Sequence, residues 1–288
     1  MKNILIFIVT VCLCSSASAT IKGYIKAGHL KVYYEVTGSG KPLLLLHAGL
    51  QDMRMWDEQI KAFSHRYKVI TIDLPEHGKT IGIDTITPVA DVIKTILDNL
   101  HIQTTSVIGL SLGSVCATDF VIAYPERVEK LLLISPGLYG FRKFLLMDTL
   151  SQKISDRNDM KYSTDNADTI ATYFTATWCD GPYRKPAEVN AVVHAYIYNT
   201  TRQHFLQHGL KNFPKFNEPS AAEKINSIQK PVLIIDGDID VPLVISIAGV
   251  LQKQISGAER ITIKNVAHML NMEEPALFNK AVLKFLEK

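Results

Sequence analysis

A serine between two glycines is the first candidate for chemistry in this chain. Gly109-Leu110-Ser111-Leu112-Gly113 is a G-x-S-x-G pattern that follows an apolar run at 106–109 and precedes a helical pattern at 112–123. The glycines permit a tight strand-to-helix turn that exposes the Ser111 hydroxyl, and the helix start offers free N–H groups to an oxyanion. A serine at this point can also act only as a helix cap. The pattern therefore predicts a nucleophile only if partners for it exist.

A nucleophilic serine needs a base, and the base needs an acid to orient it. An aspartate-rich turn at 236–240 follows the apolar residues 231–235, and His268 follows the next apolar strand pattern at 260–263. This is the chain order serine, acid, histidine, and all three would meet at one edge of a sheet. His268 alone would be interpreted as a surface loop residue, but the ordered set favours a catalytic base. The residues leave three candidates for the acid: Asp236, Asp238 and Asp240.

Acyl transfer also needs N–H groups that stabilise the oxyanion. His47-Ala48-Gly49-Leu50 comes just after the apolar run 43–46, and Gly49 or Leu50 could supply one backbone N–H. Leu112 would supply the other. His47 is a second candidate base, but we expect it to orient this loop.

Apolar runs alternate with helical patterns along most of the chain. Runs typical of buried strands are followed by amphipathic segments, and this order predicts a mostly parallel sheet flanked by helices. The expected strands are 31–36, 43–46, 69–73, 106–109, 130–134, 231–235 and 260–263. The clearest expected helices are 89–100, 112–123 and 275–286.

One long segment breaks this alternation. Residues 141–222 contain no convincing strand but do contain helical patterns at 168–178 and 188–206. We interpret this segment as a helical cap over the carboxyl edge of the sheet, where open α/β sheets bind ligands. The core would then consist of 20–140 and 223–288. Aromatic residues of the cap could line an apolar pocket or join its helices: Tyr139, Phe141, Phe144, Tyr173, Phe174, Trp178, Tyr196 and Tyr198.

Several motifs in one order resemble the α/β-hydrolase-fold serine hydrolases with a helical cap, esterases and enol-lactonases among them. They are HAGL at 47–50, MRMWDEQI at 53–60, DLPEHGKT at 73–80, GLSLG at 109–113, YPERV at 124–128, DGDID at 236–240 and NVAHMLNMEEP at 265–275. The resemblance implies Ser111 as nucleophile, His268 as base and Asp240 as acid, because Asp240 matches the last position of the family's G-x-x-D turn. Ala48 and Glu76 stand where the family more often has glycine, and Thr80 where it has serine.

The first residues resemble a secretory signal peptide. A charged start is followed by an apolar run at 4–13 and by Ala17-Ser18-Ala19, so residues 1–19 are predicted to be removed before Thr20. The apolar run is shorter than the ~20 residues that a membrane span needs. A lipid-modified Cys14 is disfavoured by the bulky Leu13 before it. We therefore expect an exported protein, periplasmic or secreted, without a stable membrane span after cleavage.

Composition excludes other classes of partner and cofactor. The 288 residues carry a net charge of +3 and no long run of Lys or Arg, which argues against nucleic-acid binding. Cys116 and Cys179 follow the signal segment, too few for a disulfide framework. His204 and His208 are spaced for a metal but have no third candidate ligand. We therefore predict no metal or organic cofactor and a small-molecule substrate.

These predictions combine into one reaction with two alternatives. We expect hydrolysis of a small carboxylic ester or lactone through an acyl-enzyme on Ser111, with His268 as base and an aspartate as orienting acid. The same residues can also serve C–C bond cleavage, amide hydrolysis or acyl transfer. The remaining alternative is an exported ligand-binding protein on the same scaffold.

Overall fold

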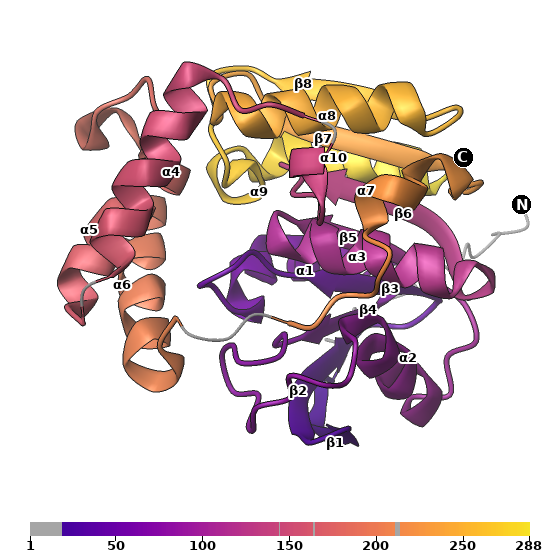
Figure 1. Ribbon diagram of the computed structural model, residues 1–288. Coiled ribbons are helices and arrows are strands. Elements are labelled where there is room, and N and C mark those ends of the chain that lie inside the picture. Colours follow the sequence, from indigo (N-terminus) through magenta and orange to yellow (C-terminus); the bar gives the residue numbers. More distant parts are fainter. Residues whose placement is uncertain (1–18, 144, 164, 211–213) are drawn as a thin grey trace, which may run out of the picture.

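The computed structural model describes residues 19–143, 145–163, 165–210 and 214–288, and within them eight strands form one sheet (Figure 1). The strand order is β1-β2-β4-β3-β5-β6-β7-β8. β1 pairs antiparallel with β2, and β2 with β4, while every other pairing is parallel. The strands are β1 (Ile21–Ala27), β2 (Leu30–Thr37), β3 (Lys41–Leu46), β4 (Tyr67–Ile72), β5 (Thr105–Leu110), β6 (Val128–Ile134), β7 (Val232–Gly237) and β8 (Glu259–Ile263). The predicted α/β architecture is confirmed.

The central strands are apolar throughout because helices cover both of their faces. In β3, Leu44 and Leu46 pack into one core cluster, whereas Leu43 and Leu45 pack into the cluster on the opposite face. α2 (Val89–Asn99), α3 (Leu112–Ala123) and α8 (Pro242–Gln254) contribute to the first cluster. α1 (Asp57–Phe63) and α10 (Pro275–Leu286) contribute to the second. The sheet is thus the middle layer of three.

The connection from β6 to β7 contains no strand among its described residues. α4 (Thr149–Tyr162), α5 (Ala167–Thr175), a π-helical turn (Ala176–Asp180) and α6 (Ala191–His208) lie together at one side of the sheet (Figure 1). The chain rejoins the core at Lys215, whose carbonyl accepts the Val89 N–H at 2.7 Å. The short helix α7 (Ala221–Lys224) packs with α3, so residues just before 222 already belong to the core layer.

The predicted signal peptide lies outside the described residues, apart from Ala19. In the part of the chain that the structure describes, no helix combines the length and apolarity needed to cross a bilayer. Cys116 and Cys179 are both buried free thiols. Cys116 belongs to the core cluster of α3, as expected for a small buried residue.

Candidate active site

Ser111 lies at the sharp turn between β5 and α3. Its φ of 55° and ψ of −111° are strained for a residue with a side chain. The flanking glycines make the turn possible, since a Cβ on Gly109 would lie 2.1 Å from the Gly113 carbonyl oxygen. A Cβ on Gly113 would lie 2.1 Å from the carbonyl oxygen of Leu46. The tight turn predicted from the G-x-S-x-G pattern is therefore present, and Ser111 lines a cavity.

His268 and Asp240 form a buried pair beside this turn. Nδ1 of His268 lies 2.9 Å from Oδ2 of Asp240, and their side chains are 2% and 0% exposed. A carboxylate only accepts hydrogen bonds, so Nδ1 donates and Nε2 is left with its lone pair. Nε2 is buried without a hydrogen-bond partner among the described residues. Donation from Nδ1 gives the tautomer that a general base needs. His268 and Ser111 line the same cavity.

The other two aspartates of the turn have different partners. Asp236 pairs with Arg260 and accepts from the Thr262 hydroxyl. Asp238 accepts the Asn265 N–H at 2.6 Å and lies 3.4 Å from the Lys264 amine. Of the three candidates, the structure brings Asp240 to His268.

The candidate oxyanion donors meet between β3 and α3. A Cβ on Gly49 would lie 3.6 Å from the Leu112 side chain, so the two backbones are neighbours. Leu112 is the first residue of α3, where the N–H has no acceptor within the helix. The Leu50 N–H, in contrast, donates to Nε2 of His77 at 3.1 Å. Of the two donors predicted in this loop, Leu50 is therefore already engaged, and Gly49 is the remaining candidate.

His47 orients the loop that carries Gly49. Its Nδ1 lies 2.8 Å from the Ala48 carbonyl oxygen and its Nε2 accepts the Leu74 N–H at 2.9 Å. Burial lowers the pKa of His47 below its usual value, which keeps the ring neutral and the acceptor available. Both nitrogens are occupied, so His47 holds the loop as expected.

Asp73 fixes the neighbouring loop by accepting two backbone N–H groups, from Met53 at 2.9 Å and from Lys79 at 2.7 Å. Gly78 is needed there because a Cβ would lie 2.3 Å from the Asp73 carboxyl group. Glu76, where the family more often has glycine, adopts a φ of 62°. This departure changes the residue but keeps the glycine-like backbone conformation.

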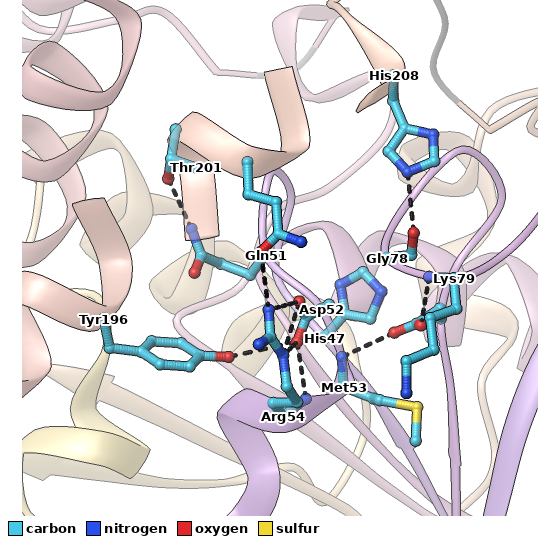
Figure 2. Close-up of polar contacts among 12 residues, drawn as sticks. His47, Gln51, Asp52, Met53, Arg54, Gly78, Lys79, Tyr196, Thr201 and His208 are labelled. Atoms are coloured by element: carbon cyan, nitrogen blue, oxygen red, sulfur yellow. Dashed lines mark hydrogen bonds and ion pairs between the residues drawn. The ribbon is translucent and has the colours of Figure 1, made fainter. Parts of the chain in front are cut away.

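Helix α6 is attached to these loops by side chains. Nε2 of Gln51 donates to Oγ1 of Thr201 at 2.8 Å, and Nε2 of His208 lies 3.0 Å from the Gly78 carbonyl oxygen (Figure 2). Both contacts join residues far apart in sequence. The helical segment is thus tied to the loops on the β3 side of the cavity.

The cavity that contains Ser111 and His268 has a volume of about 670 Å³ and is mostly apolar. Its lining residues come from the loops that follow β3, β5, β7 and β8 and from the helical segment between β6 and β7. Three of the aromatic cap residues named above line it, namely Phe141, Phe174 and Trp178. Tyr139, Tyr196 and Tyr198 instead bond to Glu218, Asp52 and Asp168, and Phe144 lies outside the described residues. The apolar wall fits a hydrophobic part of a substrate.

His204 and His208 lie on one face of α6, with ring centroids 5.3 Å apart. Over the described ranges, no group of three or more His, Cys, Asp or Glu residues is arranged to hold a metal ion. The His77 ring lies next to this pair, tilted by 47° to the His204 ring, with the two centroids 4.5 Å apart.

Comparison with known proteins places this geometry in a family. The sequence model of the protein family named alpha/beta hydrolase fold matches residues 41–275 of this chain. The carboxylesterase YbfK of Bacillus subtilis is 28% identical over 255 residues, 85% of this chain and 79% of that protein. Its crystal structure superposes with a TM-score of 0.73 at 25% identity, over 93% of this chain and 92% of that one.

Two further relatives show the breadth of the family. A 2-hydroxy-6-oxononadienedioate/2-hydroxy-6-oxononatrienedioate hydrolase of Paraburkholderia phymatum is 29% identical over 272 residues, 89% of this chain and 91% of that protein. The enol-lactonase of Burkholderia xenovorans shares the fold, with a TM-score of 0.73 at 18% identity over 92% of this chain and 100% of that one. The chain belongs to the α/β-hydrolase fold family and is a hydrolase.

Proposed function

We propose that this protein is a serine hydrolase that cleaves a small-molecule carboxylic ester or lactone through an acyl-enzyme on Ser111. One observation carries the proposal. His268 keeps a free, buried Nε2 beside the cavity of Ser111 while its Nδ1 is held by Asp240 at 2.9 Å. An imidazole that donates from Nδ1 to a carboxylate can accept the proton of a serine hydroxyl at Nε2.

The proposed reaction has two halves. Ser111 attacks the substrate carbonyl as Nε2 of His268 takes its proton, and Asp240 stabilises the imidazolium. The N–H groups of Gly49 and Leu112 bind the oxyanion of the tetrahedral intermediate. His268 returns the proton to the leaving alkoxide, and water, activated by the same nitrogen, then hydrolyses the acyl-enzyme.

The substrate class rests on relatives and on the cavity. The carboxylesterase YbfK matches in both sequence and structure. The mostly apolar cavity of about 670 Å³ fits an ester or lactone with a hydrophobic acyl or alcohol group. Cleavage of a C–C bond is the second candidate, because the Paraburkholderia relative is named as a hydrolase of a dienedioate and a trienedioate.

The test begins with a fluorophosphonate probe on the wild type and on Ser111→Ala, each weighed by intact mass spectrometry. We expect one adduct on the wild type and none on the variant. Panels of acyl esters, lactones and a vinylogous diketone then separate the two candidate reactions. A folded wild type that takes up no probe and turns over no panel substrate would contradict the proposal and favour a ligand-binding role.

We also propose that the protein is exported by cleavage of residues 1–19. The charged start, the apolar run and Ala17-Ser18-Ala19 support this proposal. Expression of the full chain in a bacterial host followed by N-terminal sequencing of the periplasmic fraction tests it. Thr20 is the expected first residue, and an intact Met1 in the cytoplasm would contradict export.

A further inference from the structure

A partly buried ion pair joins the helical cap to the loop of His268. Nη1 of Arg184 lies 2.6 Å from Oε2 of Glu273, and Nη2 lies 3.2 Å from Oε1. The side chains are only 11% and 6% exposed. Arg184 follows the π-helical turn Ala176–Asp180, whereas Glu273 ends the short helix α9 (Leu270–Glu273) behind His268. The pair therefore spans the boundary between cap and core.

The guanidinium of Arg184 also holds backbone on both sides of this boundary. Nε donates to the Asp180 carbonyl oxygen at 2.9 Å, and Nη2 donates to that of Cys179 at 2.7 Å. Nη1 reaches the carbonyl oxygen of Asn265 at 3.4 Å. A planar fork with several donors in fixed directions is specific to arginine, and a lysine amine cannot reproduce it.

Glu273 also contacts the residue just before His268. Its Oε1 accepts the Ala267 N–H at 3.2 Å. Gly181, at the end of the π-helical turn, packs so closely that a Cβ there would lie 2.9 Å from the Ala267 Cβ. Trp178 belongs to the same turn, and its ring centroid lies 4.5 Å from that of His268, with an angle of 47° between the two ring planes. Cap backbone, ion pair and imidazole thus form one contiguous contact.

Such a pair is not explained by stability alone. Burying two charges costs desolvation that their attraction only partly offsets, and apolar side chains of similar size often stabilise a fold as well. Its directional contacts, in contrast, set the position of the groups that it joins. We propose that Arg184 and Glu273 are positioning residues that hold Trp178 and the cap turn against the loop of His268, and so set the imidazole relative to Ser111. The inference rests on the proposed role of His268.

The test compares Arg184→Lys and Glu273→Gln with the wild type. Glu273→Gln keeps an acceptor for the Ala267 N–H but removes the charge, and Arg184→Lys keeps the charge but not the fork. A displacement of ~1 Å at a reacting group can cost about 10²-fold in rate, so we expect kcat to fall by up to this factor with little change in KM. The two changes should not be additive, because each disrupts the same contact.

Arg127→Lys is the matched control. Arg127 is buried, donates to the Ile102 and Gln103 carbonyl oxygens and pairs with Asp98. It precedes β6 and so lies at the amino ends of the parallel strands, whereas Ser111 lies at their carboxyl ends. This variant should have wild-type kcat per active site even if its unfolding temperature falls.

Active-site titration with the fluorophosphonate separates positioning from simple loss of fold. We expect every folded molecule of the Arg184 and Glu273 variants to be labelled, but with a lower rate constant. A labelled fraction that falls in step with unfolding, or per-site rates within twofold of the wild type for both variants, would overturn the inference. A folded wild type that takes up no probe would overturn the proposed function and the inference together, so the two failures are distinguishable.

Discussion

The N–H of Leu50 donates to Nε2 of His77 at 3.1 Å, and this bond joins the loop after β3 to the loop after β4. Nδ1 of His77 lies 2.9 Å from the Pro75 carbonyl oxygen, which only accepts, so Nδ1 carries the proton. Burial, with the neighbouring rings of His204 and His47, lowers the pKa of His77 well below its usual value. The ring is therefore neutral and serves as an acceptor for the loop that presents Gly49.

We expect His77→Leu to destabilise the fold and to slow catalysis. Loss of the acceptor leaves the buried Leu50 N–H unpaired, which costs about 1–3 kcal/mol. The same change frees the backbone beside Gly49, so kcat should also fall. Denaturant unfolding and steady-state kinetics measure the two effects. His77→Gln is the control, since its Oε1 can replace Nε2, and equal losses in both variants would contradict the role given to this bond.

Asp240→Asn should leave the fold intact and reduce kcat by about 10⁴-fold, because an amide in place of the carboxylate favours the wrong tautomer of the imidazole. Asp238→Asn is the matched control, because Asp238 lies in the same turn but accepts the Asn265 N–H instead. Its kcat should stay within a few-fold of the wild type. If Asp238→Asn proved the more damaging variant, the assignment of the acid would be reversed.

The strands and the serine turn could be predicted because their signals are local. Runs such as 43–46 and 231–235 are apolar at every position, and Gly109 and Gly113 mark the turn between β5 and α3. β1 was not predicted, because it pairs at the sheet edge and its Ile21 is exposed. α4 was missed as well, since most of its residues are polar and leave no apolar stripe.

Contacts between distant residues could not be predicted from a single chain. Choosing Gly49 over Leu50 depends on His77, 27 residues further along. The residues alone leave three aspartates as candidates, and only the family resemblance implies Asp240, the carboxylate that reaches His268. Arg184 and Glu273 are 89 positions apart, and neither residue type indicates the other. Such pairs become visible only when the fold brings two loops together.

Gly113→Ala should prevent correct formation of the turn that holds Ser111. The added Cβ would lie 2.1 Å from the Leu46 carbonyl oxygen, and backbone atoms of β3 cannot move away easily. We expect insoluble protein or a loss of several kcal/mol in the free energy of unfolding. Gly249→Ala is the control in α8, where the nearest atom, Nη1 of Arg260, is 3.5 Å from the new Cβ. Gly249→Ala should stabilise the helix by about 0.5–1 kcal/mol. A soluble and stable Gly113→Ala protein would contradict the packing described for the serine turn.

Acid should destabilise the protein partly through His204. This side chain is 6% exposed, its Nδ1 has no hydrogen-bond partner among the described residues, and burial with the nearby His208 lowers its pKa to about 3 from 6.5. Between these values the unfolded chain binds a proton that the folded chain does not, so stability is present above pH 6.5 and is lost as pH falls. The slope for one such group is about 1.4 kcal/mol per pH unit.

His204→Gln removes the contribution of His204 to the pH dependence of stability and leaves every other titrating group in place. The carboxyl of Asp119, whose pKa burial raises to about 6, acts with the opposite sign, but it is present in both proteins and cancels in the difference. We therefore expect the free energy of unfolding of the variant, relative to the wild type, to rise as pH falls from about 6 to 4, by about 1.4 kcal/mol per unit. Urea unfolding at several pH values measures this difference, with the exposed His65→Gln variant as control. Parallel curves for wild type and His204→Gln would show that His204 takes up its proton in the folded state as readily as in the unfolded one.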